Sequence, residues 1–384
     1  MKKIHVCLVS DQTIPNILSI HHSHPDEILF VSTTEMEQKQ KTEHILAALK
    51  SVGCDYSSRS HSVIVPQDSI IGAHQTLEEW TKGRDTAEFV VNLTCGTKIM
   101  SMAAYEFFKD YGARMIYIPL PRNEFLSLYP ERNAGMATPL KLRLRVCDYL
   151  AAYGLQVINV SGLRKASKDA AVRKDFSDWI VKNYTAVKNV LERLNGKLRK
   201  QRGNHDGYLL NTTYLPTSDH EREFFSKIGL THKGNEFSKQ LTMSEICFLT
   251  GGWLEEFCYN EIASITGTGI DDVAIGIRIR NSIRRDNEFD VMFTSGNALY
   301  TVECKSLDQN DDPKADALYK IAALQKEFGL KVESFFVSTS PHILRDGVLK
   351  PAIEARAAQF RTTVVPPEEV VRFGQCLKEK LSIR

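Results

Sequence analysis

The first third of the chain alternates between short β-rich runs and segments with a helical spacing of hydrophobic residues. The predicted strands are Ile4–Val9, Glu27–Val31, Phe89–Leu93 and Arg114–Ile118. The predicted helices are Lys39–Val52, which ends before Gly53, and Thr97–Tyr111, which ends before Gly112. Strands separated by helices form βαβ units with parallel strands. We therefore predict an α/β fold whose residues 1–135 form a Rossmann-like domain with a parallel sheet.

The middle of the chain, residues 136–235, has a helical pattern and many basic residues. Leu140–Tyr153 predicts a helix, and Asp169–Lys200 is a long amphipathic stretch. The basic residues are Lys188, Arg193, Lys197, Arg199, Lys200 and Arg202. They form either a solvated helix face or a set of contacts to phosphate groups, which clustered lysine and arginine bind without regard to sequence. We interpret this segment as a helical linker region.

Residues 236–384 predict a second α/β domain that contains antiparallel hairpins. Its predicted strands are Val273–Ile279, Glu288–Phe293, Leu299–Cys304 and Val332–Val337. Its predicted helices are Met243–Gly267, Lys314–Phe328 and Pro351–Phe360.

Composition narrows the class of protein but does not identify a partner. The 384 residues are 42% hydrophobic and 25% charged, with a formal net charge of +2. The hydrophobic and charged fractions are typical of a globular protein. Because the net charge is close to zero, any basic surface must be local. No apolar run approaches the ~20 residues that span a bilayer, so we expect no membrane partner. The eight cysteines include no CxxC pair, which argues against a structural zinc site and favours a reducing, cytoplasmic location.

Acidic and basic groups converge at one predicted hairpin. The turn sequence Thr294–Asn297 separates two β-rich runs, and folding there brings Asp290 diagonally near Glu303. Glu303 and Lys305 are two apart in a strand and point to the same face. Two carboxylates supply hard ligands for Mg²⁺ or Mn²⁺, and a lysine can orient water or offset charge on a phosphate. The pattern predicts phosphodiester hydrolysis with Asp290 and Glu303 as metal ligands; the alternative is an ordinary Glu–Lys pair on an edge strand.

With the upstream segment GGWLEE, this Asp…Glu-x-Lys pattern resembles the PD-(D/E)xK nuclease superfamily. The resemblance implies a restriction-endonuclease-like domain and a further acidic group on the preceding helix, Glu255 or Glu256, of which we favour Glu255. Both glutamates can instead belong to a solvated helix face. Gln325 is a weaker candidate from a later helix. The arginines before the hairpin are interpreted as phosphate contacts or as a solvated strand face: Arg278, Arg280, Arg284 and Arg285.

Two turns of the N-terminal domain are candidates for ligand contact. The first strand runs into Ser10-Asp11-Gln12-Thr13 without a glycine-rich turn, which disfavours NAD binding. The segment Asn92–Lys98 (NLTCGTK) joins a strand to a helix, where small residues expose backbone N–H groups as an anion site. It lacks the spacing of a Walker motif. Taken alone, it is also consistent with a simple capped helix start.

These four motifs together resemble the CRISPR-associated Rossmann-fold (CARF) effectors that carry a PD-(D/E)xK nuclease and are activated by cyclic oligoadenylate. The resemblance covers roughly residues 1–135 and 236–384, and Cys95 replaces a glycine of the family's usual NLTGGTK. It implies a homodimer whose sensor domains share one cyclic tetra-adenylate. It also implies a nuclease of antiviral defence that uses Mn²⁺ or Mg²⁺ to cut single-stranded DNA and RNA or to nick duplex DNA. The positions that match the family's ligand-facing loops are Ser10, Asp11, Gln12, Thr94, Gly96, Thr97 and Lys98.

Three alternative functions are less consistent with the sequence or stay open. A CARF-type regulator that binds nucleic acid without cleavage has no chemical need for Asp290, Glu303 and Lys305. A CARF ribonuclease of the HEPN type needs an R-x4-H motif, and none of the 11 histidines has an arginine five positions before it. A sensor that also degrades its own ligand stays open.

Overall fold

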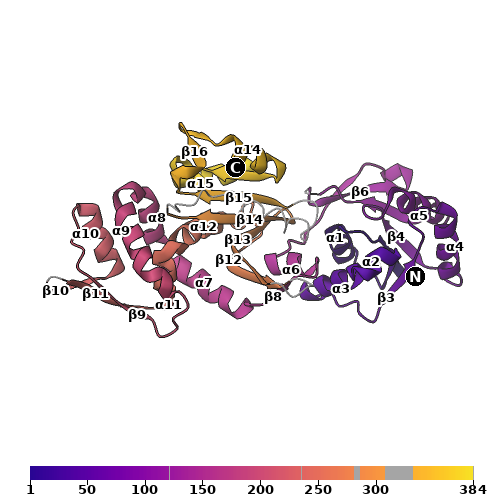
Figure 1. Cartoon of the computed structure of the whole chain (residues 1–384). Coiled ribbons are helices and arrows are strands. Elements are labelled where there is room, and N and C mark those ends of the chain that lie inside the picture. Colours follow the sequence, from indigo (N-terminus) through magenta and orange to yellow (C-terminus); the bar gives the residue numbers. More distant parts are fainter. Residues whose placement is uncertain (121, 235, 281–285, 308–331, 384) are drawn as a thin grey trace.

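The computed structural model describes residues 1–120, 122–234, 236–280, 286–307 and 332–383. An N-terminal sheet domain lies at one end of the molecule, a group of helices lies at the other, and a second sheet lies between them (Figure 1). The α/β class predicted from the sequence is confirmed. Among the described residues, no helix is both long enough and apolar enough to cross a membrane.

The N-terminal sheet has the strand order β3-β2-β1-β4-β5-β6-β7, with parallel pairing from β3 to β5 and antiparallel pairing of β6 and β7. Its strands are β1 (Lys3–Leu8), β2 (Glu27–Ser32), β3 (Ser60–Ile64), β4 (Glu88–Asn92), β5 (Arg114–Tyr117), β6 (Glu124–Tyr129) and β7 (Ala137–Pro139). Its helices are α1 (Ile14–Ser23), α2 (Thr34–Gln38), α3 (Lys41–Ser51), α4 (Ile70–Thr81), α5 (Lys98–Asp110) and the 3₁₀ turn η1 (Glu131–Asn133). The predicted parallel sheet is confirmed. The predicted helix Lys39–Val52 starts at Lys41, because Gln40 has a φ of +54° and separates α2 from α3.

The middle segment contains more breaks and more strands than its helical pattern predicts. Its elements are α6 (Val146–Ala151), β8 (Gln156–Val157), α7 (Val160–Val172), α8 (Lys174–Lys182), α9 (Tyr184–Leu198), η2 (Arg199–Gln201), β9 (Tyr208–Thr212), α10 (Asp219–Ile228) and β10 (Thr231–Lys233). The predicted helix Leu140–Tyr153 is wrong over residues 140–145, which are neither helix nor strand. There the Leu144 N–H donates to Asn297 Oδ1 at 2.9 Å, and its carbonyl accepts from Thr294 Oγ1 at 2.7 Å. Long-range hydrogen bonds thus replace helical ones.

The second sheet has the order β18-β15-β14-β13-β12-β8, antiparallel from β8 to β14 and parallel from β14 to β18. The strands of the C-terminal part are β11 (Glu236–Leu241), β12 (Asp272–Arg280), β13 (Asp286–Ser295), β14 (Ala298–Lys305), β15 (Glu333–Ser338), β16 (Leu344–Arg345), β17 (Val348–Leu349) and β18 (Thr362–Val365). Its helices are α11 (Met243–Cys247), the π turn η3 (Phe248–Gly252), α12 (Trp253–Ala263), η4 (Pro341–Ile343), α14 (Pro351–Gln359), η5 (Pro367–Arg372) and α15 (Phe373–Leu381). The predicted helix Lys314–Phe328 lies outside the described residues.

Two hydrophobic cores hold the halves of the molecule together. In one, α7 to α10 share buried side chains with α12 and one face of the second sheet, for example Leu194, Trp253 and Val302. In the other, residues 140–155 lie between α1 and α3 on one side and β12 to β14 on the other, where Leu150 and Ile277 are fully buried. The predicted domain boundaries at residues 135 and 235 stay predictions. The structure places β7 against β6, β8 against β12 and β9 against β11.

Candidate active site

The hairpin of β13 and β14 positions three of the predicted catalytic residues. Its two-residue turn, Gly296-Asn297, has φ values of +58° and +60°, the left-handed pair of a type I′ turn that matches the twist of the strands. The recorded pairing extends to Val291 opposite Val302. Asp290 and Glu303 therefore stand one step further along both strands, on one face of the hairpin.

Asp290, Glu303 and Lys305 are joined by hydrogen bonds around this position. The Cys304 N–H donates to Asp290 Oδ2 at 2.7 Å, and Lys305 Nζ donates to Glu303 Oε1 at 2.9 Å. Glu303 is buried, with 6% of its surface exposed, whereas Asp290 and Lys305 are half-buried. The predicted convergence of two carboxylates and one ammonium is present in the structure, and it is open to solvent on one side.

A break in the preceding helix brings a third carboxylate to the same place. The π turn η3 separates α11 from α12, and Gly251 within it has a φ of +130°, which L-residues with a side chain rarely adopt. A Cβ at Gly251 would lie 2.6 Å from Ser306 Oγ. The helix can therefore approach the end of β14 only without a side chain at residue 251. The continuous helix Met243–Gly267 predicted from periodicity is wrong at this kink.

The two adjacent glutamates of α12 have different surroundings. Glu256 forms a two-pronged ion pair with Arg173, whose Nε donates to Glu256 Oε2 at 2.9 Å, and it is buried. Glu255 lies close enough to Asp290 for its charge to help raise the pKa of Asp290. Glu255 is thus within electrostatic range of Asp290 and Glu303, whereas Glu256 belongs to a structural ion pair. A catalytic function of Glu255 stays a prediction.

Burial and repulsion between neighbouring carboxylates raise the pKa of two of these residues. Burial, followed by the nearby charges of Glu288 and Glu303, raises the pKa of Glu255 to about 7, although Arg202 opposes the shift. Burial, together with Glu255 and Glu303, raises the pKa of Asp290 well above its ordinary value. Carboxylates that repel one another in a partly dry site keep protons until a cation compensates their charge.

Lys305 keeps its positive charge in this environment. Burial alone would lower the pKa of Lys305, but Glu303 and Asp290 outweigh burial and raise the pKa. An ammonium in contact with a carboxylate is stabilised in its charged form. Lys305 is therefore a fixed cation at the edge of the carboxylate group.

Arg202 is a residue of this site that the sequence did not single out as catalytic. Its Nε donates to Thr250 Oγ1 at 2.6 Å, and its Nη2 donates to the Thr250 carbonyl. These bonds hold the guanidinium at the helix break, near Glu255. The sequence signal was its position at the end of the basic run that starts at Lys188, but only the fold brings that end to α12.

The donor atoms fit a hard divalent cation, although no site is fully assembled. Within the described residues, no group of three or more His, Cys, Asp or Glu side chains is arranged to hold a metal ion. Asp290 and Glu303 accept hydrogen bonds from Cys304 and Lys305 instead. Carboxylate oxygens are the ligands that Mg²⁺ and Mn²⁺ prefer, so the residues present fit such an ion by donor type.

The arginines predicted before the hairpin, and Gln325, lie either at exposed positions or outside the described residues. Arg278 is exposed on β12, and Arg280 pairs with Asp286 across the hairpin, with Nε donating to Oδ1 at 2.7 Å. Gln325, Arg284 and Arg285 lie outside the described residues.

The loop after β1 carries the first predicted ligand contacts. Ser10 Oγ accepts a hydrogen bond from the Gln12 N–H at 3.2 Å, which tightens the turn. Asp11 is exposed and lies 3.2 Å from Lys39 Nζ and 3.4 Å from Lys41 Nζ. Its carboxylate is thus compensated by two lysines that surround the loop.

The loop between β4 and α5 carries the other predicted contacts. Thr97 is the N-cap of α5, where its Oγ1 accepts from the Met100 N–H at 3.1 Å, and Lys98 is exposed in the first turn. Gly96 has a φ of +80°, and a Cβ there would lie 3.0 Å from Leu8 Cβ. Thr94 Oγ1 accepts from the Ile118 N–H at 2.8 Å. The first turn of a helix leaves backbone N–H groups without intrahelical partners, so this end of α5 suits an anion.

The two loops lie side by side and Cys95 joins them. β1 and β4 are neighbours at the point where the strand order reverses, which is where ligands bind in open α/β sheets. Cys95 Sγ donates to the Gln12 carbonyl at 3.1 Å and is buried. Burial raises the pKa of Cys95 to about 12. The cysteine that replaces a glycine is therefore a neutral contact between the loops.

Two family profiles match separate parts of this chain. The profile of the Card1 CARF domain matches residues 4–149, and that of the Card1-like endonuclease domain matches residues 243–383. Together they include both candidate loops and all the carboxylates described above. No curated protein matches the sequence.

Solved structures with the same fold cover nearly the whole chain. Can2 from Sulfobacillus thermosulfidooxidans, solved in complex with cyclic tetra-adenylate, is 24% identical with a TM-score of 0.76 and covers 99% of both chains. Protein VC1899 from Vibrio cholerae is 18% identical with a TM-score of 0.80 and covers 99% of this chain and 98% of its own. A type III CRISPR defence DNA nuclease activated by cyclic oligoadenylate is 17% identical with a TM-score of 0.52; it covers 94% of this chain but 52% of its own.

Proposed function

Because this chain belongs to the family that joins a Card1 CARF domain to a Card1-like endonuclease domain, we propose that it is a metal-dependent nuclease of CRISPR antiviral defence, switched on by a cyclic oligoadenylate. The observation that carries the proposal is the convergence of Glu255, Asp290, Glu303 and Lys305 within the endonuclease segment. Three carboxylates and an ammonium are the functional groups of PD-(D/E)xK nucleases. We infer that it acts in the cytoplasm, where nucleic acid is accessible.

Asp290 and Glu303, with Glu255 beside them, would hold Mn²⁺ or Mg²⁺. Such an ion, when bound, polarises a phosphodiester and lowers the pKa of a water molecule. The raised pKa values of Glu255 and Asp290 support this assignment, because carboxylates that repel one another gain most from a cation.

The chain's own cations complete the site. Lys305 is held beside Glu303 with its ammonium charged, so it can orient an attacking water and stabilise charge that develops on the phosphate. Arg202, fixed on Thr250, offers a guanidinium that can bind a phosphate oxygen near Glu255.

The activator that fits the N-terminal loops best is cyclic tetra-adenylate. Its phosphates are anionic, and the start of α5 presents free N–H groups and Lys98. The neighbouring loop adds Ser10, Asp11 and Gln12. Can2, with the same fold, is bound to cyclic tetra-adenylate in its structure.

An apolar surface beside these loops supports a homodimer. A groove of about 570 Å³ on α5, β5 and β6 is lined by Met102, Tyr105, Tyr117 and Leu128, and Met102 is 61% exposed. Exposed apolar patches of this kind mark interaction sites. We assign the groove to a second copy of the chain, since α5 starts at the ligand loop and a cyclic tetra-adenylate with two-fold symmetry needs two such loops.

The test is a cleavage assay with Mn²⁺ on single-stranded DNA, single-stranded RNA and supercoiled plasmid, with and without cyclic tetra-adenylate. We expect cleavage or nicking that requires the activator and is lost in Glu303→Ala. Activator-independent cleavage would contradict the switch. Activator binding without any cleavage would favour a regulator that binds nucleic acid without cutting it.

A further inference from the structure

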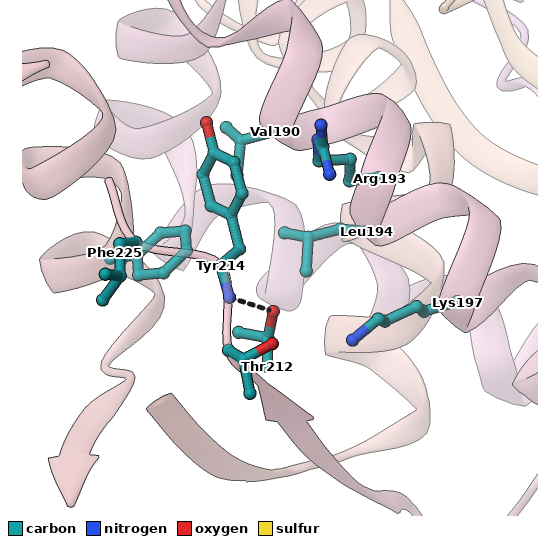
Figure 2. A pocket seen from close by; sticks show the side chains of 9 residues that line it. Val190, Arg193, Leu194, Lys197, Thr212, Tyr214 and Phe225 are labelled. Atoms are coloured by element: carbon teal, nitrogen blue, oxygen red, sulfur yellow. Dashed lines mark hydrogen bonds between the residues drawn. The ribbon is translucent and has the colours of Figure 1, made fainter. Parts of the chain in front are cut away.

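A pocket of about 580 Å³ opens in the helical part of the molecule, between α9, the segment after β9, and α10 (Figure 2). Arg193 and Lys197 point into it from α9, and Tyr214 faces them from the opposite wall (Figure 2). Leu215 contributes to the lining and is 61% exposed. The pocket therefore combines a hydrophobic wall with two cations that solvent can reach.

The polar groups of this pocket are held in place. The Arg193 guanidinium lies over the Tyr214 ring, 5.0 Å from its centre. The Tyr214 hydroxyl donates to the buried Glu221 at 2.7 Å, which fixes the ring. Lys197 Nζ donates to the Asn211 carbonyl at 3.2 Å. A planar cation in a fixed position is a surface on which a nucleobase stacks, and an ammonium beside it binds a phosphate.

Exposed cations continue from the pocket to the carboxylates. Arg193 and Lys197 are four residues apart in α9, so they lie on one face of the helix. The helix runs into η2, where Lys200 is exposed. The next cation is Arg202, which is bound to Thr250 at the helix break beside Glu255. A nucleic-acid backbone that follows these groups would reach the site of cleavage.

We propose that this pocket binds one unpaired nucleotide of a single-stranded nucleic acid whose backbone follows η2 to the carboxylates. The base stacks on the Arg193 guanidinium and contacts Leu215, and the phosphates on its 3′ or 5′ side pair with Lys197 and Lys200. A base in a duplex is stacked and paired, so it cannot enter a pocket of this kind. The inference rests on the proposed nuclease function and adds a binding site for the substrate strand outside the carboxylate site.

The experiment is an anisotropy measurement with fluorescein-labelled (dT)20 and (rU)20, full-length protein, cyclic tetra-adenylate and EDTA, so that no metal supports cleavage. The Arg193→Gln/Lys197→Gln variant should bind both strands about tenfold more weakly. Because the phosphate contact of Lys197 is lost, the slope of log Kd against log salt should fall by about 0.7. Comparison of the two strands tells whether the pocket prefers DNA or RNA.

The matched control is Arg59→Gln/Lys82→Gln in the N-terminal domain. Arg59 also lies over a tyrosine ring, 4.6 Å from the centre of Tyr56, and Lys82 is exposed. This pair removes the same charge and should bind as tightly as the wild type. Equal losses in both variants, or no loss in the pocket variant, would overturn the proposal. So would a 20-base-pair duplex whose affinity depends on Arg193 and Lys197 as strongly. Binding in EDTA requires no cleavage, so failure of the nuclease assay is a separate result.

Discussion

Thr13 Oγ1 donates a hydrogen bond to the Ala152 carbonyl at 2.7 Å, although 139 positions separate the two residues. Thr13 directly follows the candidate ligand loop, and Ala152 directly follows α6. At the other end of α6, the residues before it are bound to the hairpin turn through Asn297, which is 1% exposed. One short helix therefore connects the ligand loop to the hairpin that carries Asp290 and Glu303.

We expect Thr13→Val to reduce activation by cyclic tetra-adenylate more than it reduces binding of the activator. The near-isosteric change removes the donor to Ala152, and an unpaired buried carbonyl costs about 1–3 kcal/mol. Cleavage rates with and without activator, together with calorimetric affinity, test this. Thr81→Val is the matched control, because Thr81 is also buried and donates to a carbonyl, that of Leu77 at 2.9 Å. Equal stimulation of the Thr13→Val variant and the control would contradict the connection.

Substitutions of the two adjacent glutamates of α12 should affect different properties: the cleavage rate for Glu255 and the melting temperature for Glu256. Glu255→Gln should lower the cleavage rate by about 100-fold or more while leaving the melting temperature equal or higher, since it removes a carboxylate that other carboxylates repel. Glu256→Gln should break the buried pair with Arg173, at a cost of about 3–5 kcal/mol, and should lower Tm. Cleavage kinetics and thermal unfolding are measured on both variants. The reverse pattern would assign the catalytic carboxylate to Glu256.

The contribution of Glu255 to stability should fall as pH rises from about 4.5 to 7 when no metal is present. Burial, with Glu288 and Glu303, raises the pKa of Glu255 to about 7 in the folded chain, from an ordinary value of 4.5. Between these values the unfolded chain releases the proton and the folded chain keeps it, so unfolding becomes easier as pH rises and levels off above the folded pKa. In EDTA, the Tm of Glu255→Gln relative to that of the wild type should rise by several degrees between pH 5 and pH 8, because groups common to both proteins, such as the buried His5, cancel in this difference.

Lys305→Met should lower the cleavage rate by about 100-fold or more and leave activator binding unchanged. Methionine retains the length of the side chain but removes the ammonium that contacts Glu303. Lys239→Met is a suitable control, because Lys239 also donates to a glutamate, Glu245, away from the hairpin. Cleavage assays and calorimetry distinguish the two variants. Loss of activator binding in Lys305→Met would indicate that the substitution disturbs folding, and therefore that Lys305 has a structural function.

Thr97→Ala should weaken the affinity for cyclic tetra-adenylate and spare metal binding. Thr97 caps α5 at the candidate ligand loop and also donates to the Gln67 carbonyl at 2.9 Å, so its loss costs roughly 0.5–2 kcal/mol of stability as well. Ser69→Ala removes the equivalent cap of α4, where Ser69 Oγ accepts from the Gly72 N–H at 3.0 Å. Titration calorimetry on both variants separates the two effects. Full activity of Thr97→Ala at limiting activator would contradict the sensor assignment.

The hairpin and the parallel sheet were predictable because their signals are local. Glu303 and Lys305 share a face by strand geometry alone, and the turn falls at Gly296-Asn297, within the predicted segment Thr294–Asn297. The kink at Gly251 was not predictable, because the hydrophobic spacing on both sides of it is helical and the closeness of Gly251 to Ser306 depends on the fold. β3 was missed because none of its residues is buried.

Residues whose position depends on long-range contacts were the hardest to predict. Leu140 and Leu144 have a helical spacing, yet the segment that contains them is not helical, and Asn297 forms hydrogen bonds with Leu142 and Leu144. Arg202 looked like one member of a basic run, and only the fold sets it apart on Thr250. The choice between Glu255 and Glu256 likewise required knowledge of Arg173.

The edge strands β7 and β8 limit whether the N-terminal or C-terminal half of this protein can be exchanged for that of another. β7, at residues 137–139, closes the edge of the first sheet, and β8, at 156–157, extends the edge of the second. A chimera joined at residue 135 would leave β7 in the wrong protein and expose an unpaired sheet edge, which favours aggregation. Residues 136–157 must therefore be exchanged together with both surfaces that they contact. A working chimera would then require mutual adjustment of both sheets at this junction.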